Sequence, residues 1–205
     1  IGAQKSDNLL IMLKEIKKCG WCVGSELYES YHDAEWGSPT YDDQKLFEFL
    51  LLEGAQAGLS WITILKKREG YRKAFDGFDA EKMARYQPAR INELLLNPEI
   101  VRNRLKVESA VSNAKLFLEI RETTGCFSDY VWQFTDHQPK QNRFSSMEQV
   151  PATTSASDKM SKTMKKAGFK YVGSTICYAY MQATGMVNDH LVSCFRHEQC
   201  YRLSN

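Results

Sequence analysis

Residues 40–61 read TYDDQKLFEFLLLEGAQAGLSW, and this stretch decides the fold class. Apolar side chains recur along it with helical spacing, at Leu46, Phe49, Leu50 and Ala57. Thr40 and Asp43 have the spacing of a capping box, so we expect a helix that begins near Thr40. Glu53 continues the apolar spacing, which predicts that its side chain points toward the core.

A carboxylate on an apolar helix face is costly to bury unless it is paired or hydrogen-bonded. Glu53 therefore has two interpretations. It is a structural carboxylate satisfied by a backbone amide or an arginine, or it is held in place for a ligand. The following residues, 54–61, include many small side chains, which allow a second backbone or a flat ligand to approach closely.

The rest of the chain carries the same helical period and no convincing alternating strands. Helices are expected to begin at Ser60, Asp79, Pro88, Ser157, Ser174 and Asn188, with a long helix after Pro98. Gly70 is expected to weaken or end the first of these helices. Residues 136–157 form a long polar stretch and are expected to be a loop. The sequence thus predicts an all-α protein of about eight to ten short helices.

Composition excludes several classes of protein. The 205 residues are 43% hydrophobic and 25% charged, which is ordinary globular composition, and no apolar run is long enough to span a membrane. A net charge of +2 excludes a strongly basic coat protein for nucleic acids, but not a protein with one basic face. Six cysteines without a secretory signal favour a reducing cytoplasm. The chain begins with Ile, so we expect a trimmed or extended N-terminus.

Aromatic residues are dense near the N-terminus. Trp21, Tyr28, Tyr31 and Trp36 lie within sixteen residues, and Trp61 follows further on. Core packing is the usual role of aromatic side chains at helical spacing. The density also fits a stacking pocket for a flat ligand.

Cysteine and histidine residues at the two ends of the chain could hold a metal ion. His190 and Cys194 are four residues apart on the helix expected after Asn188, so both can bind one zinc ion. Two N-terminal ligands are also needed. Spacing leaves three pairs open: Cys19 with Cys22, Cys19 with His32, and Cys22 with His32.

Three basic clusters could contact phosphates. They are Lys66-Lys67-Arg68, then Arg102, Arg104 and Lys106, and then Lys159, Lys162 and Lys166 in a helical stripe. Such clusters are usually solvated helix faces. No dinucleotide-binding, Walker, zinc-protease or esterase motif is present, which disfavours those enzymes.

Several ordered blocks resemble one known family. They read CGW (19–21), YHDAEWG (31–37), EGAQAGLSW (53–61), TSASD (154–158), GFKYVG (168–173) and VNDH (187–190). These blocks are similar to those of the bacterial DNA-3-methyladenine glycosylase I (Tag) family of the helix-hairpin-helix superfamily. The resemblance runs from Cys19 to Cys194.

The resemblance implies an all-α helix-hairpin-helix glycosylase fold in which a zinc site joins the N- and C-terminal segments. It selects Cys19, His32, His190 and Cys194 as the ligands of one structural Zn²⁺ ion and leaves Cys22 as a spare thiol. We expect residues 1–18 to be an N-terminal extension. Residues 19–205 are then a single glycosylase domain, with two helical lobes around the pocket as the alternative arrangement.

The resemblance also implies base-excision repair. The enzyme would flip 3-methyladenine out of double-stranded DNA and hydrolyse its N-glycosidic bond, releasing the free base and leaving an abasic site without lyase activity. The implied base-binding residues are Trp21, Tyr28, Tyr31, Trp36, Trp61 and Glu53, with Glu53 also the catalytic residue. The candidate DNA contacts are Gly58, Leu59, Arg102, Arg104, Lys106, Lys162 and Lys166. We expect a cytoplasmic bacterial monomer without a membrane partner.

One feature departs from the related enzymes. Glu99 and Leu105 stand where the family commonly has glycine in its hairpin, which is expected to weaken phosphate binding there. No aspartate general base can be assigned, as in the rest of this branch. Two alternatives stay open: a zinc-stapled protein that binds alkylation damage without cleaving it, and a glycosylase for another alkylpurine such as 3-methylguanine.

Overall fold

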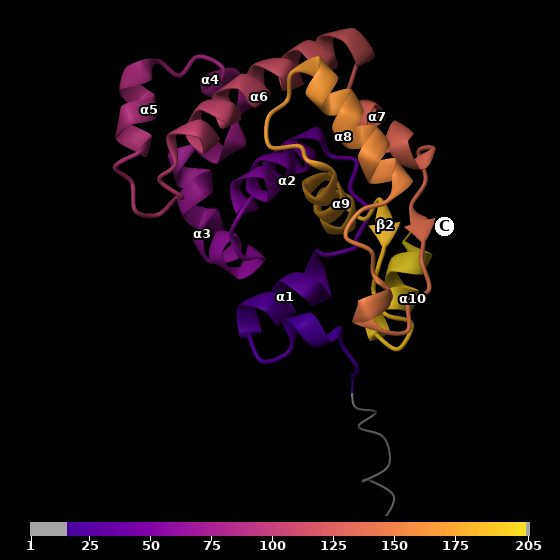
Figure 1. The fold of residues 1–205 in the computed structure, drawn as a ribbon. Coiled ribbons are helices and arrows are strands. Elements are labelled where there is room, and N and C mark those ends of the chain that lie inside the picture. The colour runs from indigo at the N-terminus through magenta and orange to yellow at the C-terminus, as the bar shows by residue number, and fades with distance from the viewer. Residues whose placement is uncertain (1–15, 204–205) are drawn as a thin grey trace, which may run out of the picture.

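The computed structural model describes residues 16–203. Within them the chain forms α-helices, short 3₁₀ helices (η) and one pair of two-residue strands (Figure 1). The α-helices are α1 (Glu26–Ala34), α2 (Asp43–Gln56), α3 (Trp61–Ala74), α4 (Ala80–Met83), α5 (Pro88–Leu94), α6 (Arg104–Thr124), α7 (Phe127–Trp132), α8 (Ser155–Ala167), α9 (Ser174–Ala183) and α10 (Phe195–Arg202). The others are η1 (Gly20–Cys22), η2 (Asp76–Phe78), η3 (Gln133–Thr135), η4 (Met147–Gln149), β1 (Lys140–Gln141) and β2 (Val187–Asn188).

The expected all-α class is confirmed, with one small exception. β1 and β2 pair in parallel, with Lys140 opposite Val187, and this contact joins the long polar stretch to the C-terminal part of the chain. Two-residue strands have no period that a sequence pattern could reveal. Among the described helices, none combines the length and the apolar character needed to cross a membrane.

Helix α2 is the central element of the fold. It packs against α3, α6, α7 and α9, and every residue from Leu46 to Ala55 is buried. A helix surrounded in this way needs apolar side chains on all sides, which this stretch supplies. The expected cap at Thr40 is wrong: Asp42 caps the helix, and its Oδ1 accepts from the Lys45 amide at 2.7 Å.

Helix α3 supports the segment between α5 and α6. Gly70 was expected to weaken or end this helix; the helix does not end there, because α3 continues to Ala74. Gly70 instead allows close packing, since an added Cβ would lie 2.5 Å from Glu99 Cβ. The Lys67 ammonium donates to the Pro98 carbonyl at 2.6 Å. Residues 97–103 are therefore fixed on α3 through main-chain and side-chain contacts.

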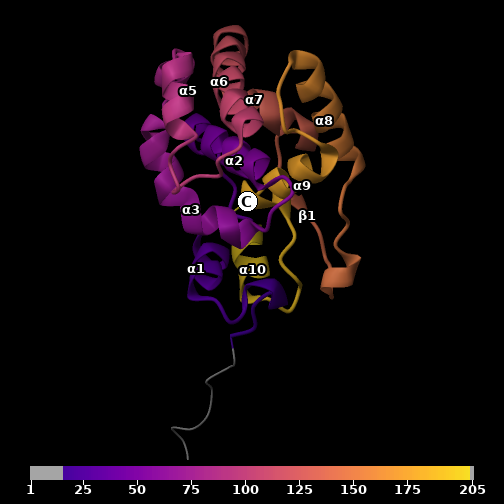
Figure 2. The same cartoon turned by 60° about the vertical axis from the view of Figure 1, so that its left-hand side comes forward.

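The N-terminal and C-terminal segments of the described chain come together below α2, in the region of α1 and α10 (Figures 1 and 2). The Phe195 amide donates to the Lys17 carbonyl at 3.0 Å. Lys18 forms ion pairs with Glu29 and Asp33, both at 2.7 Å. These contacts begin before the expected domain boundary at Cys19. That boundary stays a prediction, since residues 1–15 lie outside the described part.

Two further helix starts differ from expectation. Thr154 caps α8, where Ser157 was expected, and the two side chains form a reciprocal capping box. Asn188 belongs to β2 and does not cap a helix; the last helix, α10, begins at Phe195 with Cys194 at its N-cap. Serine and threonine in neighbouring positions compete for the same capping role, so spacing alone does not separate them.

Candidate active site and metal centre

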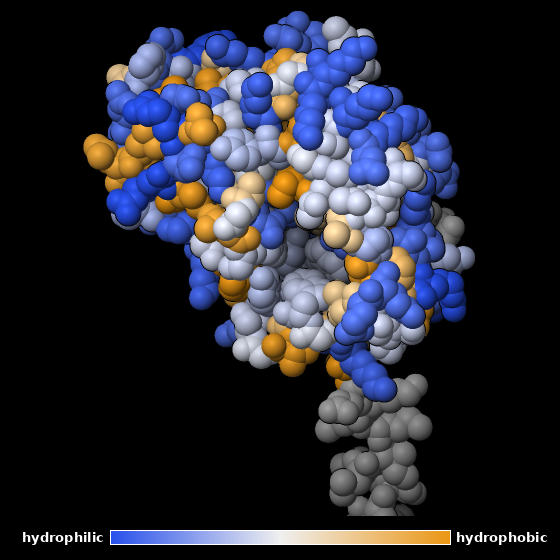
Figure 3. Space-filling model, viewed as in Figure 1, coloured by the Kyte–Doolittle hydropathy of each residue, from blue (hydrophilic) through white to orange (hydrophobic). Residues whose placement is uncertain are grey.

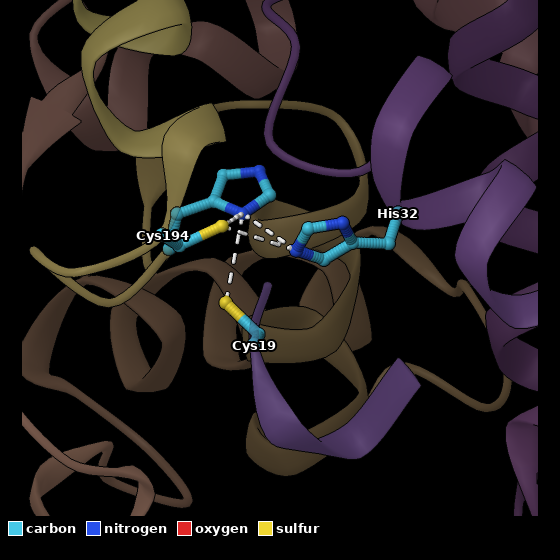
Figure 4. Close-up of side chains that lie close together, drawn as sticks. Cys19, His32 and Cys194 are labelled. Atoms are coloured by element: carbon cyan, nitrogen blue, oxygen red, sulfur yellow. Dashed lines mark hydrogen bonds between the residues drawn. The ribbon is translucent and has the colours of Figure 1, made fainter. Parts of the chain in front are cut away.

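Cys19, His32, His190 and Cys194 form one fully buried cluster. Cys19 precedes η1, His32 lies on α1, and the other two come from the turn between β2 and α10. Figure 4 shows Cys19, His32 and Cys194 pointing toward one another. The four ligand atoms lie within 4.8 Å of one another, so the cluster could hold one metal ion. Of the three N-terminal pairs left open by spacing, the structure brings Cys19 and His32 into the cluster.

The distances fit a tetrahedral site. His190 Nδ1 lies 3.2 Å from His32 Nε2, and Cys194 Sγ lies 3.4 Å from His32 Nε2 and 3.7 Å from His190 Nδ1. Ideal zinc bond lengths place ligand atoms about 3.3–3.8 Å apart at the corners of a tetrahedron. The donor set therefore matches a metal with nitrogen and sulfur ligands.

Both histidines are held in the tautomer that such a metal needs. His32 Nδ1 lies 2.7 Å from Asp33 Oδ1, and His190 Nε2 lies 2.9 Å from the Trp36 carbonyl. Each ring therefore donates away from the cluster and directs its other nitrogen into it. Burial lowers the pKa of His190, which favours its neutral, ligating form.

The expected helical spacing of His190 and Cys194 is wrong in one respect. These residues lie in a turn, in which the Cys194 amide donates to the Leu191 carbonyl at 2.8 Å. The turn still brings both side chains into the cluster. Cys22 lies outside it, and its thiol donates to the Cys19 carbonyl at 3.1 Å.

A pocket lies beside the cluster. Figure 3 shows the surface hollowed between α1 and α9. Its empty volume is about 580 Å³, which includes space open to solvent. The lining residues are Trp21, Tyr28, Tyr31, Trp36, Glu53, Gln56, Trp61, Met147, Ala179 and Gln182. All six residues expected to bind a base line this one pocket.

The aromatic rings of the pocket support one another and the cluster. Trp21 packs edge-on against Tyr28 at 5.4 Å and against Trp36 at 5.1 Å between ring centroids. Trp36 in turn lies 4.6 Å from the His190 ring. The cluster thus ties the aromatic wall, built from the N-terminal segment, to the C-terminal segment.

Glu53 lies in the pocket without compensation for its charge. The predicted burial is confirmed, since the residue is 3% exposed, and this burial raises its pKa to about 8. Its Oε2 has no hydrogen-bond partner within the described part of the chain. A structural carboxylate satisfied by an arginine would resemble Glu48, which accepts from Arg68 Nε at 2.6 Å. Glu53 lacks such a partner and remains available to a ligand.

Neither neighbouring tyrosine satisfies Glu53. The Tyr28 hydroxyl accepts from the Ile62 amide at 2.8 Å, which fixes the start of α3 against α1. Burial, followed by the charge of Glu53, raises the pKa of Tyr31, which keeps its hydroxyl protonated. The indole N–H of Trp61 also lacks a partner among the described residues. The pocket therefore presents an unpaired acceptor and an unpaired donor.

Sequence patterns missed four residues of the pocket: Gln56, Met147, Ala179 and Gln182. Met147 comes from η4 within the polar stretch, and no local pattern places that stretch over the pocket. Gln182 comes from α9, and its Nε2 donates to Asp189 Oδ2 at 2.8 Å. Gln56 belongs to the EGAQAGLSW block and could have been found there.

The expected DNA-contacting residues lie in different places. Gly58 has a φ of +77°, and Leu59 is 41% exposed in the loop between α2 and α3. Arg102, Arg104, Lys162 and Lys166 are exposed. Arg104 is paired with Glu108 at 3.3 Å and also donates to Asn92. Lys106 is partly buried, and its ammonium contacts main-chain carbonyls.

Comparisons with known proteins agree on one family. The family model described as "Methyladenine glycosylase" matches residues 21–197. DNA-3-methyladenine glycosylase 1 of Escherichia coli (strain K12) is 48% identical over 179 residues, covering 87% of this chain and 96% of that protein. A crystal structure of 3-methyladenine DNA glycosylase I (TAG) has a TM-score of 0.86 at 48% identity, covering 87% of this chain and 98% of that one. A variant of such an enzyme, solved in complex with 3-methyladenine, has a TM-score of 0.84 at 35% identity and covers 87% and 96%. This chain belongs to the methyladenine glycosylase family.

Proposed function

We propose that the protein is a DNA-3-methyladenine glycosylase of base-excision repair. It hydrolyses the N-glycosidic bond of 3-methyladenine in alkylated double-stranded DNA, releases the free base and leaves an abasic site. The observation that carries this proposal is the aromatic pocket with an unpaired, buried Glu53 in its wall. The E. coli relative and the relative bound to 3-methyladenine support it.

The chemistry of the lesion fits this pocket. A glycosidic bond inside a duplex is inaccessible, so the nucleotide must be flipped out of the stack. Methylation at N3 gives the purine a positive charge, which aromatic ring faces favour over a neutral base. The Glu53 carboxylate can accept from the amino edge of the base and complement its charge. The cationic base is already a good leaving group, so selective binding supplies much of the catalysis.

We propose that the buried cluster binds one structural zinc ion through Cys19, His32, His190 and Cys194. A site with four protein ligands has no open coordination position, so the metal would take no part in hydrolysis. It would hold the two ends of the chain together and thereby keep Trp21 and Trp36 in the pocket wall. Asp33 and the Trp36 carbonyl would orient the two histidines.

We propose a DNA interface on the face that bears the pocket. Leu59, presented by the turn at Gly58, would fill the space left by the flipped nucleotide. Arg102, Arg104, Lys162 and Lys166 would contact phosphates, with residues 97–103 as the hairpin of a helix-hairpin-helix motif. The monomeric state and the bacterial cytoplasm expected from the sequence stay predictions.

The test is excision from a duplex treated with a methylating agent. We expect free 3-methyladenine in the supernatant by chromatography and an equal number of abasic sites in the DNA. Strand breaks should appear only after alkali, because no lyase activity is expected. Binding without base release would favour the damage-binding alternative. Release of 3-methylguanine in place of 3-methyladenine would indicate a shifted substrate.

A further inference from the structure

The side chain of Lys106 crosses from the first turn of α6 to the carboxyl end of α2. Its Nζ donates to the Ala55 carbonyl at 2.8 Å and to the Ala57 carbonyl at 2.6 Å. Arg104 on the same helix turn pairs with Glu108, whereas Lys106 forms no ion pair with an acidic side chain among the described residues. Burial lowers the pKa of Lys106. Two of its three N–H donors are thus committed to main chain, unlike those of an exposed phosphate-binding lysine.

The contacted carbonyls lie where α2 ends. Helix ends leave carbonyl groups without helical partners, and a cation is favourable near them. Ala57 already departs from helical geometry, with φ of −44° and ψ of 117°. The Leu59 amide then donates to the Gln56 carbonyl at 2.6 Å, which closes the turn. Lys106 therefore fixes the first residue of the loop that presents Leu59.

Lys106 lies in the first turn of α6, which begins immediately after residues 97–103. Those residues are fixed on α3 through Gly70 and Lys67. One short path thus connects the proposed phosphate-binding hairpin with the loop of Gly58 and Leu59. The path is short, since it passes only through the first turn of α6.

We infer that Lys106 is a positioning residue, which sets the Ala57–Ser60 loop relative to the hairpin so that Leu59 enters the duplex when the hairpin binds the backbone. This inference rests on the proposed function. It replaces the expectation that Lys106 contacts a phosphate. The lysine acts on base flipping and leaves the pocket for the free base unchanged.

The experiment compares Lys106→Met, which keeps the length but removes the donors, with Lys106→Arg, which keeps donors and charge. Lys115→Met is the matched control, because Lys115 is exposed on the same helix. Three quantities are measured: single-turnover excision of 3-methyladenine, affinity for the free base, and the salt dependence of DNA binding. Insertion of Leu59 into the duplex is followed separately by the fluorescence of 2-aminopurine beside an abasic-site analogue.

We expect Lys106→Met to slow excision and reduce the fluorescence change by about tenfold or more, the size of effect that misplacing a positioned group can have. Its affinity for the free base should stay within about a factor of two of the wild type. Its salt slope, the slope of log DNA affinity against log salt concentration, should be unchanged. Lys106→Arg should recover most of the excision, and Lys115→Met should behave as wild type.

A decrease of about 0.9 in the salt slope, with excision restored at low salt, would identify a phosphate contact and overturn the inference. Unchanged excision and fluorescence in Lys106→Met would overturn it as well. If Lys106→Met does not fold, Lys106→Gln, which keeps N–H donors but removes the charge, decides: an unchanged salt slope with insertion retained supports the inference, and a salt slope smaller by about 0.9 contradicts it. Absence of excision in the wild type would instead refute the proposed function, while the fluorescence assay would still test Lys106.

Discussion

Replacing Glu53 by glutamine should stabilise the folded protein and weaken base binding at the same time. The carboxyl group is buried, and its pKa rises from 4.5 to about 8 on folding. Between these values the folded state holds a proton that the unfolded state has lost, so the free energy of unfolding falls as pH rises. The contribution is fully present below about pH 4.5 and is lost as pH rises through about 8. Glutamine carries no charge and contributes no such dependence.

The shift of about 3.5 pKa units corresponds to about 5 kcal/mol, since one unit is about 1.4 kcal/mol. The stability difference between Glu53→Gln and wild type should therefore increase with pH, by about 1 kcal/mol per pH unit between pH 5 and 8. Urea denaturation at a series of pH values measures this difference. Glu119→Gln is the matched control, because Glu119 is exposed on α6, and it should show no such trend.

Base binding should respond in the opposite direction. Loss of a charge-assisted hydrogen bond is expected to cost about 1.5–3 kcal/mol, or roughly ten- to a hundredfold in affinity for free 3-methyladenine. The ratio of the two affinities should rise with pH and level off above about pH 8, where Glu53 is mostly ionised, and protonation of the ligand cancels in this ratio. A stability difference that is flat with pH, together with base affinity retained within about a factor of two, would refute the reasoning.

Three other variants test separate parts of the account. Cys194→Ala should reduce bound zinc to well below one per chain and lower the melting temperature. Cys22→Ser should retain the metal. Elemental analysis that finds no difference between the two variants would contradict the assigned ligands. Gly70→Ala should lower the free energy of unfolding, measured by urea denaturation, by about 1–3 kcal/mol, because the added Cβ would lie 2.6 Å from the Glu99 carbonyl oxygen. It should also weaken excision while free-base affinity stays intact. Normal excision would show that the hairpin tolerates the shift. Leu59→Ala should slow excision while leaving the melting temperature unchanged, since Leu59 is exposed. A wild-type excision rate would show that Leu59 does not fill the space left by the flipped nucleotide.

The burial of Glu53 could be predicted because helical spacing on α2 is a local property of the sequence. The gathering of its aromatic partners could be inferred from the resemblance, but not from spacing, which also fits core packing. Gln182 and Met147 could not be found in this way, because their places in the pocket depend on how α9 and the polar stretch pack against α1 and α2.

Other differences have equally specific causes. Gly70 looked like a helix breaker because glycine lowers helix propensity, but its role is to let Glu99 approach. His190 and Cys194 have a spacing that a helix would suit, yet a turn before α10 brings them together equally well. Lys106 lies in a basic cluster by sequence, while the structure directs its ammonium to the end of α2. In each case a tertiary contact determines the role of the residue, and a local sequence pattern does not contain that contact.

The account depends most directly on where a methylated base binds, which a crystal structure of the protein soaked with 3-methyladenine would show. We predict that the ring lies in the pocket between α1 and α9, against the aromatic wall. Its amino edge should lie within hydrogen-bond distance of Glu53, about 2.7–3.2 Å. A base bound elsewhere, or one in the pocket whose amino edge points away from Glu53, would contradict the account.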